Sequence, residues 1–375
     1  MKGVRALLVF GTRPEAIKMA PVVRKCRESQ GISALVCSTG QHREMLQWVI
    51  EYFNIEPDIE LQLMMPNQSL SKFSAQCLEK LDEVVQQTDP DCLVAQGDTT
   101  SAMIAALCAF YRKIPFIHVE AGLRSRDLHA PWPEEMNRRV ADMLASVWCA
   151  PTALAQRFLI EEGYPLNRIY LTGNTVVDAL LETIQHERNN ENEYYGKFPF
   201  ARDGRFVLVT AHRRESFGHG LENICRALLE LSSVFSDVSF VYPVHMNPNV
   251  QQTVKTFLSH QHNIVLMPPL NYQEFVWLLS KCLFVMTDSG GVQEEAPSLG
   301  KSVVIMRDNT ERSEVLHLGL GYLAGTKCEK IVECASYLLS DRTRLNRDFS
   351  NGNPFGDGRA GERITKLISC RAWES

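Results

Sequence analysis

The sequence has no long apolar run. No segment reaches the roughly 18 uninterrupted apolar residues that a membrane-spanning helix needs. The N-terminal run Val4–Phe10 is interrupted by Arg5 and followed by the polar segment 11–15, so it is too short and too charged for a signal peptide. We therefore expect no association with a membrane.

An excess of positive charge and closely spaced cysteines are also lacking. The 375 residues carry 39 Lys and Arg against 44 Asp and Glu, a net charge of −5, which provides no basic field for a nucleic-acid partner. The eleven cysteines are scattered, with Cys328 and Cys334 nearest to each other, and none has the C-x-x-C spacing of a metal or redox site. This pattern predicts free thiols, a cytoplasmic location and no metal site.

The common nucleotide fingerprints are missing as well. Neither G-x-G-x-x-G nor G-x-x-x-x-G-K-[ST] occurs, so we expect no nicotinamide cofactor and no Walker-type phosphate loop. What is present is an ordinary globular composition, with 45% hydrophobic and 22% charged residues. At roughly 100 to 200 residues per domain, the length predicts two domains.

Short apolar runs alternate with amphipathic stretches along the chain, as in parallel sheets covered by helices on both faces. The expected strands are Val4–Phe10, Ser33–Ser38, Cys92–Gln96, Phe116–Glu120 and Ser146–Ala150, then Phe206–Thr210, Ser239–Pro243, Ile264–Met267, Leu283–Thr287 and Ser302–Met306. The expected strands thus form two series, one before and one after the segment 185–197. Two series predict an α/β protein with two doubly wound, Rossmann-like domains facing across a cleft. A polar, solvent-exposed segment, 185–197, lies between the two groups, and we place the boundary before it, near residue 172.

Polar residues follow the predicted strands, where ligands bind in doubly wound domains. Arg13 and Lys18 lie around the start of a predicted helix, where an anion would be stabilised. The two side chains therefore either contact a diphosphate or are simply solvated cations. In the second half, Ser289–Gly291 would let a phosphate approach another helix start. Glu295, one turn further, is suited to accept hydrogen bonds from ribose hydroxyls; a simple capped turn is the alternative.

Three carboxylates occupy similar positions in the first half. Asp98 and Glu120 follow predicted strands and Glu134 begins a helix, while His212 follows a strand of the second half beside Arg213. Each alone is more often a cap or an ion-pair member. Together they resemble an acid/base site with an anion clamp.

At this point the chain resembles the non-hydrolysing UDP-N-acetylglucosamine (UDP-GlcNAc) 2-epimerases. The resemblance covers nearly the whole chain and rests on GTRPEAIKMAP (11–21), TGQHREM (39–45), GDTTS (97–101), HVEAGLRS (118–125), PWPEEMNR (131–138), TGNTVVDALL (172–181), AHRRES (211–216), YPVHMNPNV (242–250), TDSGGVQEEAPSLGK (287–301) and NPFGDG (353–358). It implies a GT-B fold with domains at 1–172 and 173–355, and a C-terminal helix, 356–375, that packs on the first domain. It also implies a homodimer.

The resemblance implies reversible interconversion of UDP-GlcNAc and UDP-N-acetylmannosamine (UDP-ManNAc). UDP would be eliminated to leave 2-acetamidoglucal and then added back, without a redox cofactor or metal, to supply ManNAc for a surface polysaccharide. Asp98, Glu120 and Glu134 would be the acid/base residues and His212 the fourth active-site residue, with the role of each in each direction left open.

The same matching implies the residues that bind the UDP-sugar. They are Arg13, Lys18, Asp98, Glu120, His212, Leu270, Phe275, Ser289, Gly290, Gly291, Glu295 and Arg312. Phe275 would lie against uracil, although its helical spacing also fits a core position. The family usually has proline where this chain has Ser313, so the turn that aims Arg312 loses a backbone restriction.

Two further points stay open at this stage. Some members are activated by UDP-GlcNAc at a second site. Gln41, Arg213 and His245 match residues of that site. Glu44 does not match, because the activated members tend to have Gln at this position. The alternatives to reversible epimerisation are a hydrolysing epimerase that releases free ManNAc, a GT-B glycosyltransferase, and a catalytically silent UDP-sugar sensor.

Overall fold

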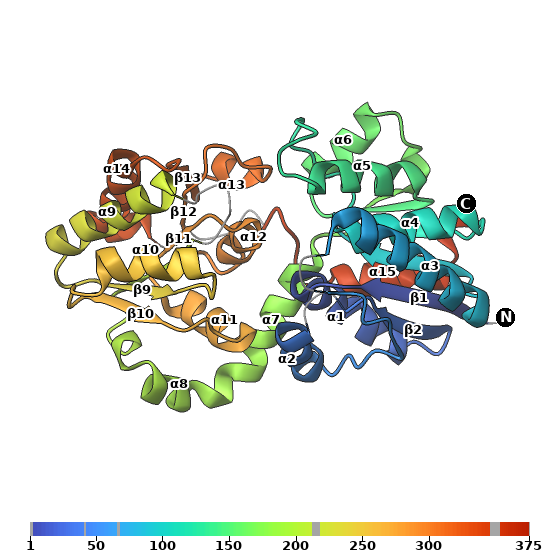
Figure 1. Ribbon diagram of the computed structural model, residues 1–375, viewed down its shortest axis with the longest axis horizontal. Coiled ribbons are helices and arrows are strands. Elements are labelled where there is room, and N and C mark those ends of the chain that lie inside the picture. Colours follow the sequence, from blue (N-terminus) through green and yellow to red (C-terminus); the bar gives the residue numbers. More distant parts are fainter. Residues whose placement is uncertain (1–2, 41–42, 66–67, 212–217, 346–352, 375) are drawn as a thin grey trace. The chain divides into compact units, whose positions relative to one another are not determined.

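The computed structural model describes residues 3–40, 43–65, 68–211, 218–345 and 353–374. The chain divides into two compact units (Figure 1). Unit 1 comprises residues 1–179 and 354–375, and unit 2 comprises residues 180–353. The limits of these units lie a few residues from the domain boundaries expected at 172 and 355. The domain boundaries themselves stay predictions.

Unit 1 is built on a parallel sheet in which the described residues form seven strands, in the order β3-β2-β1-β4-β5-β6-β7. The strands are β1 (Val4–Phe10), β2 (Ile32–Ser38), β3 (Ile59–Glu60), β4 (Cys92–Gln96), β5 (Phe116–Val119), β6 (Val147–Ala150) and β7 (Ile169–Leu171). Its helices are α1 (Arg13–Glu28), α2 (Arg43–Phe53), α3 (Leu70–Thr88), α4 (Thr100–Tyr111), α5 (Glu134–Leu144), α6 (Ala153–Glu161) and α15 (Ala360–Ser369), and α7 (Thr175–Glu187) begins here and continues into unit 2. Burial of β1, β4, β5 and β6 on both faces explains their continuous apolar sequences.

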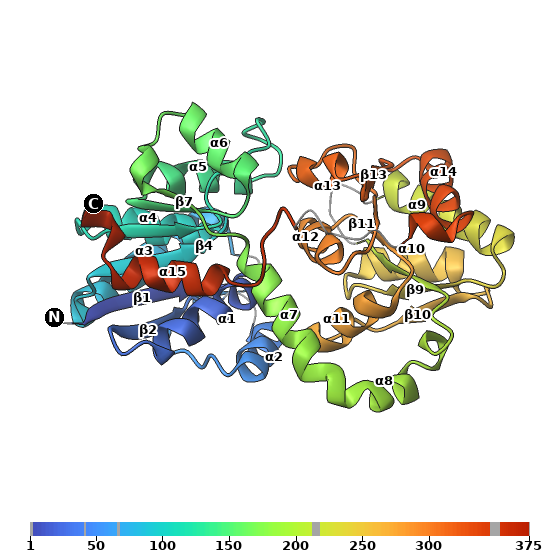
Figure 2. The ribbon, with the colours of Figure 1, turned by 180° about the vertical axis from the view of Figure 1, so that it is seen from behind.

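Helix α15 returns from the end of the chain to pack against α1 in unit 1 (Figure 2). The Cys26 thiol lies 3.6 Å from the Thr365 hydroxyl across this contact. Gly361 permits this close approach, because a Cβ at this position would lie 3.0 Å from the backbone of Pro21 and would press the two helices apart. The N-terminal end of α15 is joined to α7, since Asp178 accepts hydrogen bonds from the amides of Ala360 and Gly361.

Unit 2 repeats this arrangement on a second parallel sheet, whose described strands run in the order β10-β9-β8-β11-β12-β13. They are β8 (Phe206–Thr210), β9 (Ser239–Pro243), β10 (Ile264–Met267), β11 (Val285–Thr287), β12 (Val303–Ile305) and β13 (Gly321–Leu323). The helices are α8 (Glu191–Lys197), α9 (His219–Val234), α10 (Pro248–Leu258), α11 (Tyr272–Lys281), α12 (Gly290–Ser298), α13 (Ser313–His317) and α14 (Cys328–Leu339). The first six strands of each unit, taken in chain order, follow the same 3-2-1-4-5-6 pattern, so the prediction of two similar α/β halves is confirmed.

The predicted strands are all present, with ends that differ by at most two residues. Sequence patterns missed β3, β7 and β13, which have only two or three residues each and therefore too little alternation to recognise. The segment 185–197 is largely helical, and Tyr194 within it is buried against Trp277, so its predicted exposure is wrong at that residue. None of the helices in the described part of the chain is long and apolar enough to cross a membrane.

Candidate active site

Asp98 and Glu120 lie at the same edge of the unit 1 sheet. Strands β4 and β5 are parallel neighbours in which Gln96 pairs with Val119, so Asp98 and Glu120 follow the carboxyl ends of adjacent strands. Glu120 has a φ of 66°, a left-handed conformation that is unfavourable for a residue with a side chain. Backbone strain of this kind is typical of functional sites.

Two donors contact the Glu120 carboxylate. Lys18 Nζ donates to Glu120 Oε2 at 2.6 Å, and Gln96 Nε2 donates to the same oxygen at 2.9 Å. The side chains of Lys18 and Glu120 are only 9% and 4% exposed, so this ion pair is desolvated. Lys18, predicted as a diphosphate contact, is therefore also an electrostatic partner of a predicted acid/base residue.

Helix α5 connects Glu134 to Asp98. Glu134 is the first residue of this helix, where the helix dipole favours a negative charge. On the same helix, Arg138 donates to the Asp98 carboxylate, and Asn137 Nδ2 donates to the Asp98 carbonyl at 2.9 Å. These two bonds join α5, the helix that begins with Glu134, to Asp98 at the end of β4, next to the strand that leads to Glu120.

Arg13 lies at the start of α1, next to this edge. Thr12 caps the helix together with Glu15, whose carboxylate accepts from the amides of Gly11 and Thr12 and from the Thr99 hydroxyl at 2.6 Å. Burial raises the pKa of Glu15, although these hydrogen bonds oppose the rise. The loop after β1 is thereby joined to the start of α4, which keeps Arg13 beside the Asp98 loop.

Sequence reasoning missed the residues that orient the carboxylates. Gln96 contacts Glu120, Asn137 and Arg138 contact Asp98, and none of the three was among the predicted site residues. A usable signal was present for Arg138, because it follows Glu134 by four residues and so shares its helix face.

In unit 2, the predicted phosphate-binding segment forms the start of α12. Ser289 is the N-cap residue, and its amide donates to the Thr287 hydroxyl at 2.9 Å. Arg312 lies over Gly290, since a Cβ at Gly290 would be 2.9 Å from Arg312 Nη1. The structure thus brings the predicted glycines and Arg312 together at a helix N-terminus.

Two carboxylates hold the Arg312 side chain in place. Its Nε donates to Glu294 Oε1 at 2.7 Å and its Nη1 donates to Glu311 Oε1 at 2.6 Å. Ser313 begins helix α13 directly after Arg312. The orientation of Arg312 is therefore supported by buried ion pairs with Glu294 and Glu311.

Glu295 and the two predicted uracil contacts belong to neighbouring parts of unit 2. Glu295 Oε1 accepts from the Tyr272 hydroxyl at 3.1 Å, which joins α12 to α11. Phe275, on the same helix as Tyr272, is partly buried against the core, and Leu270, just before that helix, is buried.

The remaining predicted residues are Gln41, His212, Arg213 and His245. Gln41, His212 and Arg213 lie outside the described residues. His245 is exposed after β9, and its Nδ1 accepts from the Asn247 amide at 3.1 Å. Among the residues that are described, no group of three or more His, Cys, Asp or Glu is placed to bind a metal ion.

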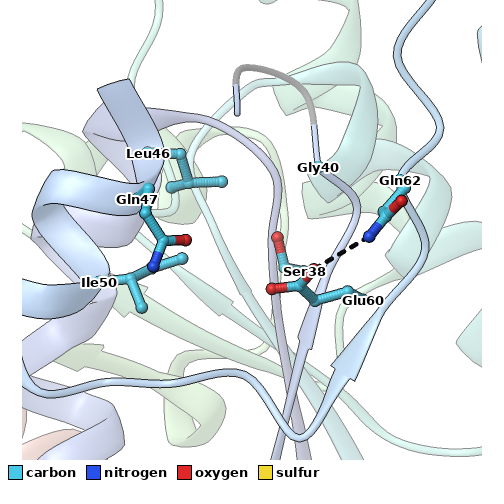
Figure 3. A pocket seen from close by; sticks show the side chains of 7 residues that line it. All are labelled: Ser38, Gly40, Leu46, Gln47, Ile50, Glu60 and Gln62. Atoms are coloured by element: carbon cyan, nitrogen blue, oxygen red, sulfur yellow. Dashed lines mark hydrogen bonds between the residues drawn. The ribbon is translucent and has the colours of Figure 1, made fainter. Parts of the chain in front are cut away.

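A cavity of about 400 Å³ lies elsewhere in unit 1, between α2 and the ends of β2 and β3. Leu46, Gln47 and Ile50 line it from the helix, opposite Glu60 and Gln62 (Figure 3). Gln62 Nε2 donates to Glu60 Oε2 at 3.3 Å. None of the three predicted carboxylates lines this cavity.

Known proteins share this sequence and architecture. The family model described as UDP-N-acetylglucosamine 2-epimerase matches residues 24–369. The UDP-N-acetylglucosamine 2-epimerase of Escherichia coli K12 is 44% identical over 369 residues, which cover 97% of this chain and 98% of the relative. The crystal structure of UDP-GlcNAc 2-epimerase from Neisseria meningitidis bound to UDP-GlcNAc is 42% identical, with a TM-score of 0.93 and coverage of 97% of this chain and 99% of the other.

A second solved structure, S. aureus MnaA with UDP, is 38% identical, with a TM-score of 0.90 and coverage of 98% and 96%. These similarities extend over both units and confirm the GT-B fold and the isomerase class predicted from the sequence. The chain belongs to the UDP-N-acetylglucosamine 2-epimerase family.

Proposed function

We propose that the chain interconverts UDP-GlcNAc and UDP-ManNAc by eliminating UDP to form 2-acetamidoglucal and adding it back. The observation that supports this proposal is that the elements carrying Asp98, Glu120 and Glu134 adjoin one another at the carboxyl edge of the unit 1 sheet. Elimination needs a base for the weakly acidic C2 proton, and its return to the other face needs an acid. Three carboxylates on neighbouring elements can supply both groups.

Contacts with basic side chains favour the ionised form of two of the three carboxylates, Glu120 and Asp98. A buried ammonium at 2.6 Å favours the ionised carboxylate, which is the form that accepts a proton. Asp98 contacts the Arg138 guanidinium, which favours its ionised form as well. We assign Asp98, Glu120 and Glu134 to proton transfer, with His212 as the fourth catalytic residue by its match to the family.

The UDP-sugar contacts expected from the sequence are also part of the proposal. In unit 2, the start of α12 at Ser289–Gly291 would bind phosphate, with Arg312 supplying positive charge. Glu295 would bind the ribose, and Leu270 and Phe275 would contact uracil. In unit 1, Arg13 and Lys18 would contact the diphosphate. Relatives solved with UDP-GlcNAc and with UDP support these ligands.

Incubation with UDP-GlcNAc in D₂O, followed by proton NMR, tests the reaction. The product should be UDP-ManNAc carrying deuterium at C2, and a parallel incubation that starts from UDP-ManNAc should reach the same ratio of epimers. Retention of protium at C2 would exclude the elimination mechanism. Free ManNAc as the product would indicate a hydrolysing epimerase, and sugar transfer only to an added acceptor would indicate a glycosyltransferase.

The biological setting follows from this proposal. UDP-ManNAc would supply ManNAc units for a surface polysaccharide, and the protein would act as a homodimer. The cytoplasmic location expected from the sequence stays a prediction, as does activation by UDP-GlcNAc through Gln41, Arg213 and His245.

A further inference from the structure

His118 is a fully buried histidine on β5, the strand that leads to Glu120, and it pairs with Ala95 of β4, the strand that leads to Asp98. Its Nδ1 lies 2.6 Å from Asp142 Oδ1 on α5, and its Nε2 lies 2.8 Å from the carbonyl oxygen of Gly97. Both ring nitrogens are therefore engaged in short hydrogen bonds inside the core.

Both partners of His118 are hydrogen-bond acceptors. The Gly97 carbonyl can only accept, and the Asp142 carboxylate already accepts from Arg124 Nη1 at 2.7 Å and from the Gly122 amide at 3.2 Å. A neutral imidazole has a single N–H and can donate to only one of them. Because Arg124 and the Gly122 amide also stabilise the ionised Asp142 carboxylate, the geometry favours an imidazolium, with a proton on each ring nitrogen.

The surrounding charges balance this cation. Asp142 faces it from α5 and Arg124 from the loop after β5, while Glu162 at the end of α6 pairs with Arg124 at 2.6 Å. Tyr164, whose ring is tilted against Trp148, and Arg139 are further titratable side chains near this group. Two cations and two anions make a neutral set, which is the arrangement that lets charges persist in a core.

Burial by itself would lower the pKa of His118. The charge of Asp142 and the hydrogen bonds to Asp142 and Gly97 outweigh burial and raise the pKa above its ordinary value. The same contacts outweigh burial at Asp142, whose pKa is lowered. Both directions agree with the proton positions that the acceptors require.

The network contacts the three segments that carry the predicted carboxylates. Gly97 directly precedes Asp98, and Gly122 follows Glu120 by two residues. Asp142 lies on α5, the helix that begins with Glu134. A single buried ion pair therefore joins the Asp98 loop, the Glu120 turn and the Glu134 helix.

We propose that His118 is a positioning residue for the epimerase reaction: its imidazolium fixes the Gly97 carbonyl, and hence Asp98, relative to the Glu120 turn and α5. This role rests on the proposed function. His118 acts on the carboxylates through backbone and through Asp142, and does not itself transfer the substrate proton. Misplacement by about 1 Å can cost roughly 100-fold in rate, so the network is in a position to control turnover.

The first test compares the steady-state kinetics of His118→Asn and His118→Gln with the wild type. Each variant keeps one donor and loses the charge, so kcat should fall by about 10- to 100-fold while KM and UDP affinity change by less than about threefold. The matched control is Asp178→Asn, another buried carboxylate of unit 1, which accepts from Ala360 and Gly361 at α15. It should lower stability with near-normal kcat.

The second test measures the charge directly by NMR of the ring nitrogens in protein labelled with ¹⁵N-histidine. The His118 signals, assigned by their loss in His118→Asn, should show both nitrogens protonated at pH values above the ordinary titration range of histidine. A neutral His118 ring at pH 7 would overturn the proposal. Normal kcat in a folded His118→Gln variant would also overturn it.

The two proposals can fail separately. A wild-type protein that does not epimerise UDP-GlcNAc would contradict the proposed function, and the NMR measurement would still decide the charge of His118. If His118→Asn does not fold, Asp142→Asn provides the second variant: it should release the second ring proton and lower kcat by a similar factor, and a normal kcat there would count against the positioning role.

Discussion

Lys18 Nζ donates a 2.6 Å hydrogen bond to Glu120 Oε2, and both side chains are almost completely buried. Removing one member of a buried ion pair leaves a desolvated charge, which typically costs about 3 to 5 kcal/mol. Lys18→Met should lower the free energy of local unfolding around β5 by this amount. Hydrogen exchange of the β5 backbone amides measures this free energy. The double variant Lys18→Met, Glu120→Gln should recover part of the loss; a double variant as unstable as the single one would show that the pair is not coupled.

Amide variants of the three carboxylates should separate catalysis from binding. Asp98→Asn, Glu120→Gln and Glu134→Gln keep the side-chain shape but remove the proton-transfer group, so kcat should fall by roughly 100-fold or more. UDP binding, followed by calorimetry, should persist. Glu79→Gln, at an exposed position of α3, is the control that should remain fully active. Near-normal turnover in any of the three would demote that residue to a structural role.

Neighbouring glycines at the start of α12 should respond differently to alanine. A Cβ at Gly290 would lie 2.9 Å from Arg312 Nη1, whereas a Cβ at Gly291 meets nothing within 4 Å. Gly291→Ala should raise stability by up to about 1 kcal/mol, the usual preference for alanine in a helix. Gly290→Ala should displace the guanidinium from Glu294 and weaken UDP binding by about 10-fold. Equal melting temperatures for the two variants would contradict this account.

Thiol labelling of the native protein should be slow at the buried cysteines. Burial raises the pKa of Cys26 to about 11 and that of Cys149 to about 12, so few thiolates form at neutral pH. Cys370 is exposed and should react first with a chromogenic disulfide reagent. The rapid phase should disappear in Cys370→Ser. Cys328 and Cys334 are half-buried and should react at an intermediate rate. A phase in that variant as rapid as the Cys370 phase would contradict this order of accessibility.

The His118–Asp142 pair predicts how stability depends on pH. Because the folded-state pKa of His118 is raised above 6.5, its contribution is complete below that pH and is lost as pH rises through the raised value. The pKa of Asp142 is lowered below 3.8, so its contribution is complete above that pH and is lost as pH falls through the lowered value. Melting temperatures of the wild type should show an alkaline decline that His118→Asn lacks. Identical alkaline profiles for the two proteins would assign the decline to other groups.

Local pattern was sufficient for most of the fold. Strands β1, β4 and β8 appear with the bounds expected from their apolar runs, because burial on both faces makes such runs nearly continuous, with Arg5 the exposed exception in β1. The same reasoning placed Asp98 and Glu120 at strand ends. It could not find β3, β7 or β13, whose pairing with a neighbour, rather than their own composition, makes them strands.

The sequence by itself determined that this chain is a two-unit α/β protein of the UDP-N-acetylglucosamine 2-epimerase family, with polar residues after its strands. Only the tertiary structure decided which of those residues meet. Lys18 and Glu120 are 102 positions apart, and His118 and Asp142 are 24 apart on a strand and a helix. Periodicity reports which face of an element a side chain occupies, but the charge on His118 depends on two acceptors that the folded chain brings to its ring.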